Sequence, residues 1–166
     1  MISFADIPKA IFSRILASAK KILCATDLNV ASSEAVIRAV QLAHQYNSKI
    51  IMLNVHEEFL NKNELVMSRV SVEKLQKLYQ TISLKAKSEL RKLIHDNMGD
   101  DIEIDILLKE GRASENIICI AEQHNCDLII IGSNGKDSIT DYILGTTTNI
   151  VVNKSKVPVL VVPTIK

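Results

Sequence analysis

The chain has 166 residues and a mass of 18.4 kDa, which suits one domain with a sizeable core and leaves no room for a second full domain. Twenty Lys and Arg residues against 19 Asp and Glu give a net charge of +1, so the usual electrostatic case for a nucleic-acid or membrane-surface partner is missing. Apolar residues make up 47% of the chain but aromatic residues only 4%, so the core must consist of Ile, Leu, Val and Ala, as in a buried parallel sheet.

The first segment, from Ser3 to Ala19, is expected to form an amphipathic helix outside the main fold. Two roles remain open for it: a helix that packs over the sheet, or one that docks a partner. Neither a secretion signal nor a membrane span is expected, because no run of about 18 apolar residues occurs. The apolar side of the helix carries Ile7, Ile11, Phe12, Ile15 and Leu16.

Short β-branched runs then alternate with segments of helical period, which is the pattern of repeated βαβ units. The runs predict strands at Lys21–Thr26, Lys49–His56, Ile102–Lys109, Asp127–Gly132 and Val157–Pro163.

Helices are expected between these strands. The first follows Ser32 and Ser33, either of which can cap its unpaired amides. A long amphipathic helix with a solvated charged face is predicted from 72 to 93, and a shorter one follows Gly111 and ends near Asn125.

A sheet of this kind binds ligands in the crevice beyond the carboxyl ends of its strands, where the strand order reverses. If the chain winds outward through its first three strands and returns beside the first, that crevice lies between the first and fourth strands. The first strand ends at Ala25, Thr26 and Asp27, and the fourth ends at Ile131 and Gly132.

Glycines and threonines follow the fourth strand in a pattern that favours a phosphate site. The fourth strand runs into the sequence Gly132-Ser133-Asn134-Gly135-Lys136. Nine residues separate Gly135 from the next glycine, Gly145, which is followed by Thr146, Thr147 and Thr148. Glycines allow a ligand to approach the backbone closely, and the free amides at a helix start attract anions. The alternative is a simple turn at Gly132 and Gly135 before a helix capped by Thr146.

Taken together, these motifs resemble the ATP-binding subgroup of the universal stress protein family. The nucleotide signature of that family is Gly, two residues, Gly, nine residues, Gly, then Ser or Thr, and Gly132, Gly135, Gly145 and Thr146 match it. The similarity extends from Lys21 to Pro163. It implies a single α/β domain over residues 21–166, with residues 1–20 as an extra helix. The implied fold is Rossmann-like and adenine nucleotide alpha hydrolase-like: an open, parallel, five-stranded sheet in the order 3-2-1-4-5 with helices on both faces.

The resemblance also implies a binding site for ATP with Mg or Mn on its phosphates, and no catalytic residue. Ala25, Thr26 and Asp27 would line the adenosine half, the main chain of Val55 would contact the adenine edge, and Ile131 would cover the base. The ribose and phosphates would lie along Gly132, Ser133, Asn134, Gly135 and Lys136 and against Gly145, Thr146, Thr147 and Thr148.

The function that the resemblance implies is that of a cytoplasmic, nucleotide-dependent module of the stress response, acting through protein partners. A homodimer through the last strand, Val157–Val162, is expected because that edge is apolar and unguarded; the rival interpretation is an edge covered by the extra helix. A slow ATPase or phosphotransferase is the alternative function, with Asp27 orienting water or metal and with Lys136 and Asp137 nearby.

Other reactive residues have simpler interpretations. Cys24, Cys119 and Cys126 form no Cys-x-x-Cys motif and are expected to be reduced thiols of a cytoplasmic protein. The histidines at 44, 95 and 124 fall on predicted helix ends or faces and are expected at the surface. The acidic run from Asp100 to Asp105 alternates with isoleucine, which predicts a half-exposed strand rather than a cation site.

Overall fold

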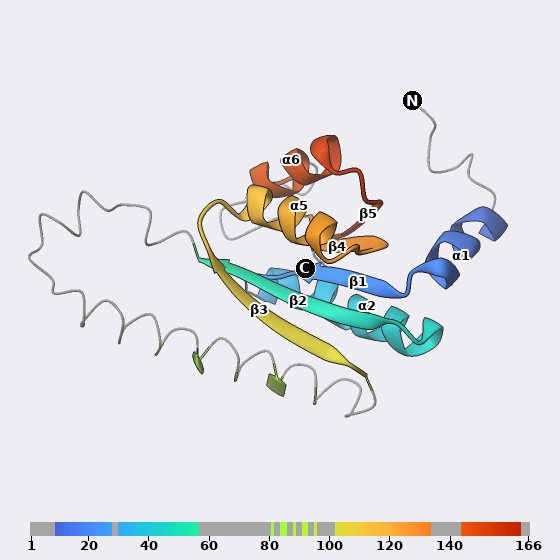
Figure 1. The fold of residues 1–166 in the computed structure, drawn as a ribbon, viewed down its shortest axis with the longest axis horizontal. Helices are drawn as coiled ribbons and strands as arrows, with labels where there is room; N and C mark the ends of the chain where they lie inside the picture. Colours follow the sequence, from blue (N-terminus) through green and yellow to red (C-terminus); the bar gives the residue numbers. More distant parts are fainter. Residues whose placement is uncertain are drawn as a thin grey trace, which may run out of the picture.

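A computed structural model describes residues 9–27, 30–56, 102–133 and 144–163, together with Thr81, Leu84, Lys85, Ser88, Arg91, Lys92 and His95. Five parallel strands form one sheet in the order β3-β2-β1-β4-β5, which confirms the predicted fold (Figure 1). The strands are β1 (Lys21–Ala25), β2 (Lys49–His56), β3 (Ile104–Glu110), β4 (Leu128–Gly132) and β5 (Val159–Val162). The helices with described bounds are α1 (Lys9–Ser18), α2 (Val30–Tyr46), α5 (Ala113–Gln123) and α6 (Thr146–Lys154).

Four of the five strands differ from the prediction by one or two residues at one or both boundaries. The first strand ends at Ala25 instead of Thr26, the third runs over Ile104–Glu110 instead of Ile102–Lys109, and the fourth begins at Leu128 instead of Asp127. The fifth is shortest, because Pro158 has no N–H to donate to a ladder and the strand begins after it. The carbonyl of Pro158 still accepts a hydrogen bond from Ile129 N at 2.9 Å.

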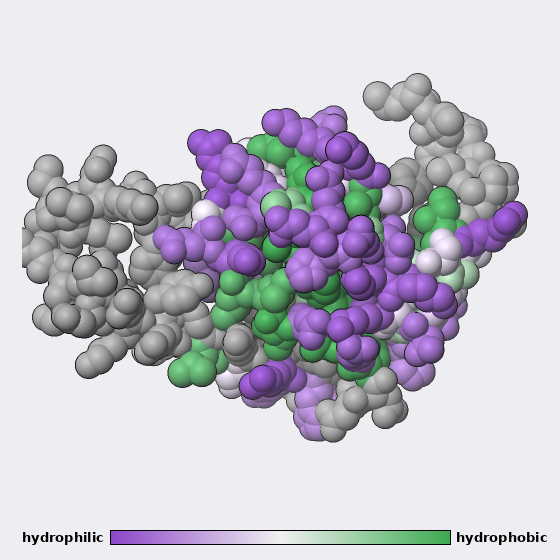
Figure 2. Space-filling view, viewed as in Figure 1, coloured by the Kyte–Doolittle hydropathy of each residue, from purple (hydrophilic) through white to green (hydrophobic). Residues whose placement is uncertain are grey.

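The core consists of two apolar layers, one on each face of the sheet. Alternate strand residues point to opposite faces, so Ile22 and Cys24 pack with α2 whereas Leu23 and Ala25 pack with α5 and α6. Figure 1 shows α5 and α6 together on one side of the strands and α2 on the other. In the same view, Figure 2 shows apolar atoms at the surface below α5, over β2 and β3, framed by polar side chains.

The start of α2 differs from the prediction. Ser32 and Ser33 were expected to cap this helix, but α2 begins at Val30, so both serines lie inside its first turn. Ser32 is buried, and its hydroxyl is hydrogen-bonded to the Thr26 hydroxyl at 2.8 Å. This serine therefore connects α2 to the end of β1.

The extra helix α1 packs against α2 through buried Leu16, with Ala19 beyond its end in the same core layer. Ile15, which was predicted on the packed side, is 40% exposed. The described part of α1 makes its main contacts with α2 rather than with β5. The predicted residues Ile7, Ile11 and Phe12 have no described side chains, because residues 1–8 lie outside the described part and only the backbone is described from 9 to 12.

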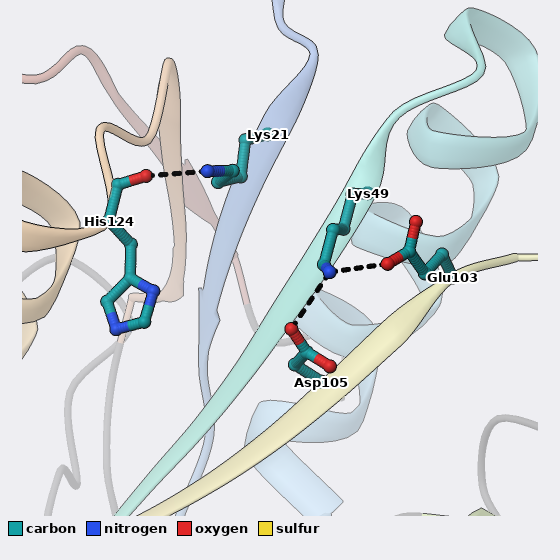
Figure 3. A network of polar contacts seen from close by, with 5 residues as sticks. All are labelled: Lys21, Lys49, Glu103, Asp105 and His124. Carbon is teal, nitrogen blue, oxygen red and sulfur yellow. Dashed lines mark hydrogen bonds and ion pairs between the residues drawn. The ribbon is translucent and has the colours of Figure 1, made fainter.

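Charged groups connect the amino ends of the strands (Figure 3). Lys49 Nζ forms ion pairs with Glu103 and, at 3.0 Å, with Asp105. Lys21 Nζ donates to the carbonyl of His124 at 2.8 Å. Glu103 and Asp105 are exposed while Ile104 is half-buried, which confirms the predicted alternation.

Most of the predicted long helix from 72 to 93 lies outside the described residues. The residues described there are helical and exposed, including Lys85 and Arg91 of the predicted charged face. His44, His95 and His124 are exposed, as predicted.

Candidate functional site

The predicted crevice lies at the carboxyl ends of β1 and β4, which are neighbours in the sheet with Ala25 opposite Ile131. After β1 the chain continues into α2 on one face, and after β4 it reaches α6 on the other. Two adjacent parallel strands that lead to opposite faces form a topological switch point, where ligands of open α/β sheets bind.

The β4 side of this crevice is fixed by hydrogen bonds across a segment that lies outside the described residues. Ser133 N donates to Val162 O at 2.8 Å, and Gly145 N donates to Ser133 O at 2.9 Å. The hydroxyl of buried Thr148 donates to Gly132 O at 2.8 Å. These bonds hold the amino end of α6 next to the end of β4.

Helix α6 begins at Thr146, and Gly145 is its N-cap residue. The alternative in which Thr146 caps the helix is therefore wrong, because Thr146 is the first helical residue and no side chain bonds the cap. The Thr148 hydroxyl already donates to Gly132 O within the protein. Thr146 is exposed and Thr147 is half-buried. Free helix-start amides carry partial positive charge and suit an anion.

The β1 side is built around Thr26, which is buried directly after the strand. Thr26 N donates to Leu53 O at 3.0 Å, its hydroxyl bonds Ser32, and its carbonyl accepts from Asn54 Nδ2 at 2.8 Å. Ala25 is buried, and Asp27 is partly exposed at the same edge. The predicted adenosine residues are therefore held by α2 and β2 together.

Sequence reasoning missed Asn54, whose side chain is 2% exposed. Its Oδ1 is buried and has no hydrogen-bond partner in the described part of the chain, as is also true of His56 Nε2 two residues further along β2. The sequence does contain a signal for this residue. Asn54 lies two residues after Met52, so it is a polar amide on the α2 face of an otherwise apolar strand.

The main chain of Val55 lies beyond the last paired residue of the β1–β2 ladder, which is Leu53 opposite Ala25. Leu53 bonds towards β1, and His56 bonds towards β3 through Gly111 N. Because main-chain groups alternate in direction along a strand, the N–H and C=O of Val55 point towards β1. Among the described residues neither group has a hydrogen-bond partner.

The other predicted residues fall into two groups. Ile131 is 6% exposed and its side chain belongs to the core layer under α5 and α6, so its predicted role over a base stays a prediction. Asn134, Gly135 and Lys136, with Asp137, lie outside the described residues. The structure thus brings together the ends of β1, β2 and β4 and the start of α6.

The two buried cysteines, Cys24 and Cys126, contribute packing rather than reactivity. Cys24 lies directly before Ala25, but burial raises the pKa of its thiol to about 12. Burial likewise raises the pKa of Cys126 to about 11. Since thiolates are the reactive form, neither group is a nucleophile at neutral pH. No group of three or more His, Cys, Asp or Glu side chains suited to a metal ion occurs among the described residues.

No helix in the described ranges has the length and apolarity that a membrane crossing requires.

Comparison with known proteins gives a family match and several structural relatives. The profile described as the Universal stress protein family matches residues 18–163. Universal stress protein MJ0577 of Methanocaldococcus jannaschii is 28% identical over 152 residues, covering 86% of this chain and 94% of the relative. The solved structure of MJ0577 has a TM-score of 0.71 and covers 89% of this chain and 98% of its own.

Two further solved structures share the fold at lower identity. A universal stress protein in complex with cAMP has a TM-score of 0.61 at 22% identity and covers 89% of this chain and 98% of its own. One from Archaeoglobus fulgidus in complex with dAMP has a TM-score of 0.53 at 18% identity, with coverages of 85% and 95%.

Proposed function

This chain belongs to the universal stress protein family, and from that premise we propose that it is an ATP-binding regulatory module of the cytoplasm. The observation that carries the proposal is the convergence of three elements on one edge of the sheet. Three features lie around the switch point between β1 and β4: the end of β1, the main chain of Val55, which has no partner among the described residues, and the start of α6, which no side chain caps.

In this proposal the adenosine half of ATP lies against Ala25, Thr26 and Asp27, with the adenine edge at the main chain of Val55. The phosphates lie along Gly132–Lys136 and the start of α6, where Gly145 presents no side chain. A Mg or Mn ion is bound by phosphate oxygens.

The comparisons support a nucleotide ligand at the level of the fold. The relatives in complex with cAMP and dAMP carry adenine nucleotides, and both share the sheet of this chain. The triphosphate is proposed from the chain itself, because its glycine spacing matches the signature of the ATP-binding subgroup.

A binding role is favoured over rapid catalysis. Phosphoryl transfer needs a group that orients the attacking water and cations that stabilise the developing charge. Of the predicted site residues that the structure describes, Asp27 is the one with an ionisable side chain. We therefore expect single-turnover hydrolysis far below about 1 per second, the ordinary lower range of enzymes. Faster turnover would favour the ATPase alternative.

A homodimer through the last strand is part of the proposal. Within the described chain β5 pairs with β4 alone, and Val159, Leu160 and Val161 are each half-exposed. An apolar strand edge with free main-chain groups is suited to pairing with a second copy. Val161→Lys should therefore halve the mass measured by light scattering, whereas an unchanged mass would place the interface elsewhere.

Equilibrium binding of ATP with magnesium to the purified chain tests the central claim. Gly145→Val and Thr146→Ala should both weaken binding, because they alter the proposed phosphate end of the site. Val152→Ala is the matched control, since this residue is exposed near the other end of α6. Undetectable binding by the unaltered chain at millimolar ATP would refute the proposal.

A further inference from the structure

We propose that Asn54 is a positioning residue for nucleobase recognition: its side-chain amide ends the β1–β2 ladder and so keeps the main chain of Val55 free for the ligand. The inference rests on the proposed nucleotide site and adds a residue that determines its base specificity. It follows from one hydrogen bond, that of Asn54 Nδ2 to Thr26 O, and from the register of the two strands.

The register shows which bond is missing. Lys49 N donates to Lys20 O, the carbonyl one residue before its partner Lys21. Continued along the strands, the same rule would make Val55 N donate to Thr26 O. That carbonyl instead accepts from Asn54 Nδ2 at 2.8 Å. The side chain of one residue thus replaces the ladder bond of the next.

The replacement is held firmly. Asn54 is 2% exposed, so water does not compete for its amide. Thr26 is also bonded through its N–H to Leu53 O and through its hydroxyl to Ser32. The end of β1 is therefore fixed from β2 and from α2, with the Thr26 carbonyl directed at the Asn54 amide.

Packing does not account for an amide at this position. The preceding residues on the same face of β2, Ile50 and Met52, are apolar and fully buried. Because Nδ2 donates to Thr26, the orientation of the amide is determined and Oδ1 faces away from that carbonyl, without a partner in the described chain. Burying an unsatisfied acceptor destabilises the fold, which an apolar residue here would avoid.

Within the described chain, Val55 therefore has a donor and an acceptor without partners at the edge of the crevice. Val55 N–H and C=O complement a base edge that presents a ring nitrogen acceptor beside an amino donor, as adenine does. A hypoxanthine base instead carries an oxygen acceptor and a ring N–H donor, so the two positions are exchanged. A site built to bond one pattern rejects the other, because its polar groups are left unpaired.

The first experiment needs no nucleotide. Amide hydrogen exchange by NMR on the ligand-free chain should show Val55 exchanging faster than Leu53. In Asn54→Leu the Thr26 carbonyl is released to Val55 N–H, and Val55 exchange should slow at least tenfold. Asn54→Val, which removes the donor with a smaller apolar side chain, should behave likewise, and it carries the test if the Leu variant does not fold. Met52→Leu is the matched control on the same face and should change nothing.

The second experiment compares ATP with inosine triphosphate, which has the same ribose and phosphates. Asn54→Leu should weaken ATP binding at least tenfold and inosine triphosphate binding much less, while its thermal midpoint stays equal to or above that of the unaltered chain. A merely structural residue would lower the affinity for both nucleotides together.

The two proposals fail differently. If the unaltered chain binds no ATP, the proposed function is wrong, and the exchange experiment still decides the role of Asn54. If ATP binds but the preference over inosine triphosphate survives Asn54→Leu, or if Val55 is already protected in the ligand-free chain, the positioning role is wrong and the nucleotide site stands.

Discussion

The two ends of the sheet treat their polar groups in opposite ways. At the amino ends Asp127 Oδ2 accepts from both Lys20 N and Lys21 N, each at 2.9 Å, and Lys49 pairs with two carboxylates. At the carboxyl ends the structure leaves Asn54 Oδ1, His56 Nε2 and the start of α6 without side-chain partners in the described chain.

This difference separates stability from function in one small fold. At the amino end, Asp127 and Lys49 have their hydrogen-bond and ion-pair partners within the protein. These interactions connect strands that are distant in sequence and need no ligand. Polar groups at the carboxyl end that lack a partner in the described chain destabilise the ligand-free state, and the proposed nucleotide would recover this free energy by supplying partners. Variants at the amino end should therefore change the free energy of unfolding without changing ATP binding, whereas variants at the carboxyl end should change ATP binding.

The largest expected effect is stabilisation by the ligand itself. ATP at 100 times its dissociation constant should raise the free energy of unfolding by about 2.7 kcal/mol, since it binds the native state alone. Asp127→Ala, at the amino end, should keep the whole increment, whereas Gly145→Val should lose it at the same ATP concentration. Denaturant midpoints with and without ATP measure both. An increment lost in Asp127→Ala would break the division between the ends.

Next in size is the bond that joins α6 to β4. Thr148→Val keeps the shape of a 4% exposed side chain but leaves Gly132 O without its donor, so stability should fall by about 1–3 kcal/mol. ATP affinity should fall as well, because this bond fixes the start of α6. Val152→Thr, an exposed change on the same helix, is the control. Normal ATP affinity in Thr148→Val would mean that the position of α6 does not matter for binding.

The fold was predictable to within a few residues because its signals are local. Aliphatic runs such as Lys49–His56 mark buried strands, and their alternation with helical segments determines the fold class. The glycine and threonine pattern likewise located the end of β4 and the start of α6. Each of these inferences depends on residues close together in the chain.

The bonds that shape the site depend on register, which local patterns do not contain. Asn54 reaches Thr26 across 28 positions of sequence, and Thr148 reaches Gly132 across 16. The same limit explains the error at Ser32, which is a plausible cap by residue type but bonds Thr26 because α2 begins two residues earlier. A polar residue on the buried face of a predicted strand is the signal to look for.

A smaller effect is expected at the amino end. Asp127→Ala removes one acceptor from two main-chain amides at an exposed turn, and stability should fall by about 1 kcal/mol. Asp127→Asn, which keeps an oxygen at the same place, should lose less. The binding constant for ATP should be unchanged in both variants, as measured by calorimetry. A change in ATP affinity would show that the two ends of the sheet are coupled.

The smallest effect belongs to Lys49, and pH reveals it. Hydrogen bonds to Glu103 and then Asp105 raise the pKa of this lysine above its ordinary value of 10.5. A lysine pKa that is higher in the folded state stabilises the fold fully below about 10.5, and the contribution disappears as pH rises through the folded value. At pH 8 the denaturant midpoint of the unaltered chain should therefore be slightly higher than that of Lys49→Met. Above pH 10.5 the midpoints of the two proteins should converge. High salt should reduce the difference at pH 8, because the three side chains are partly exposed. A difference that persists at high pH would assign the role of Lys49 to packing of its alkyl chain, and the amino end would then be held by Asp127 and Lys21 without it.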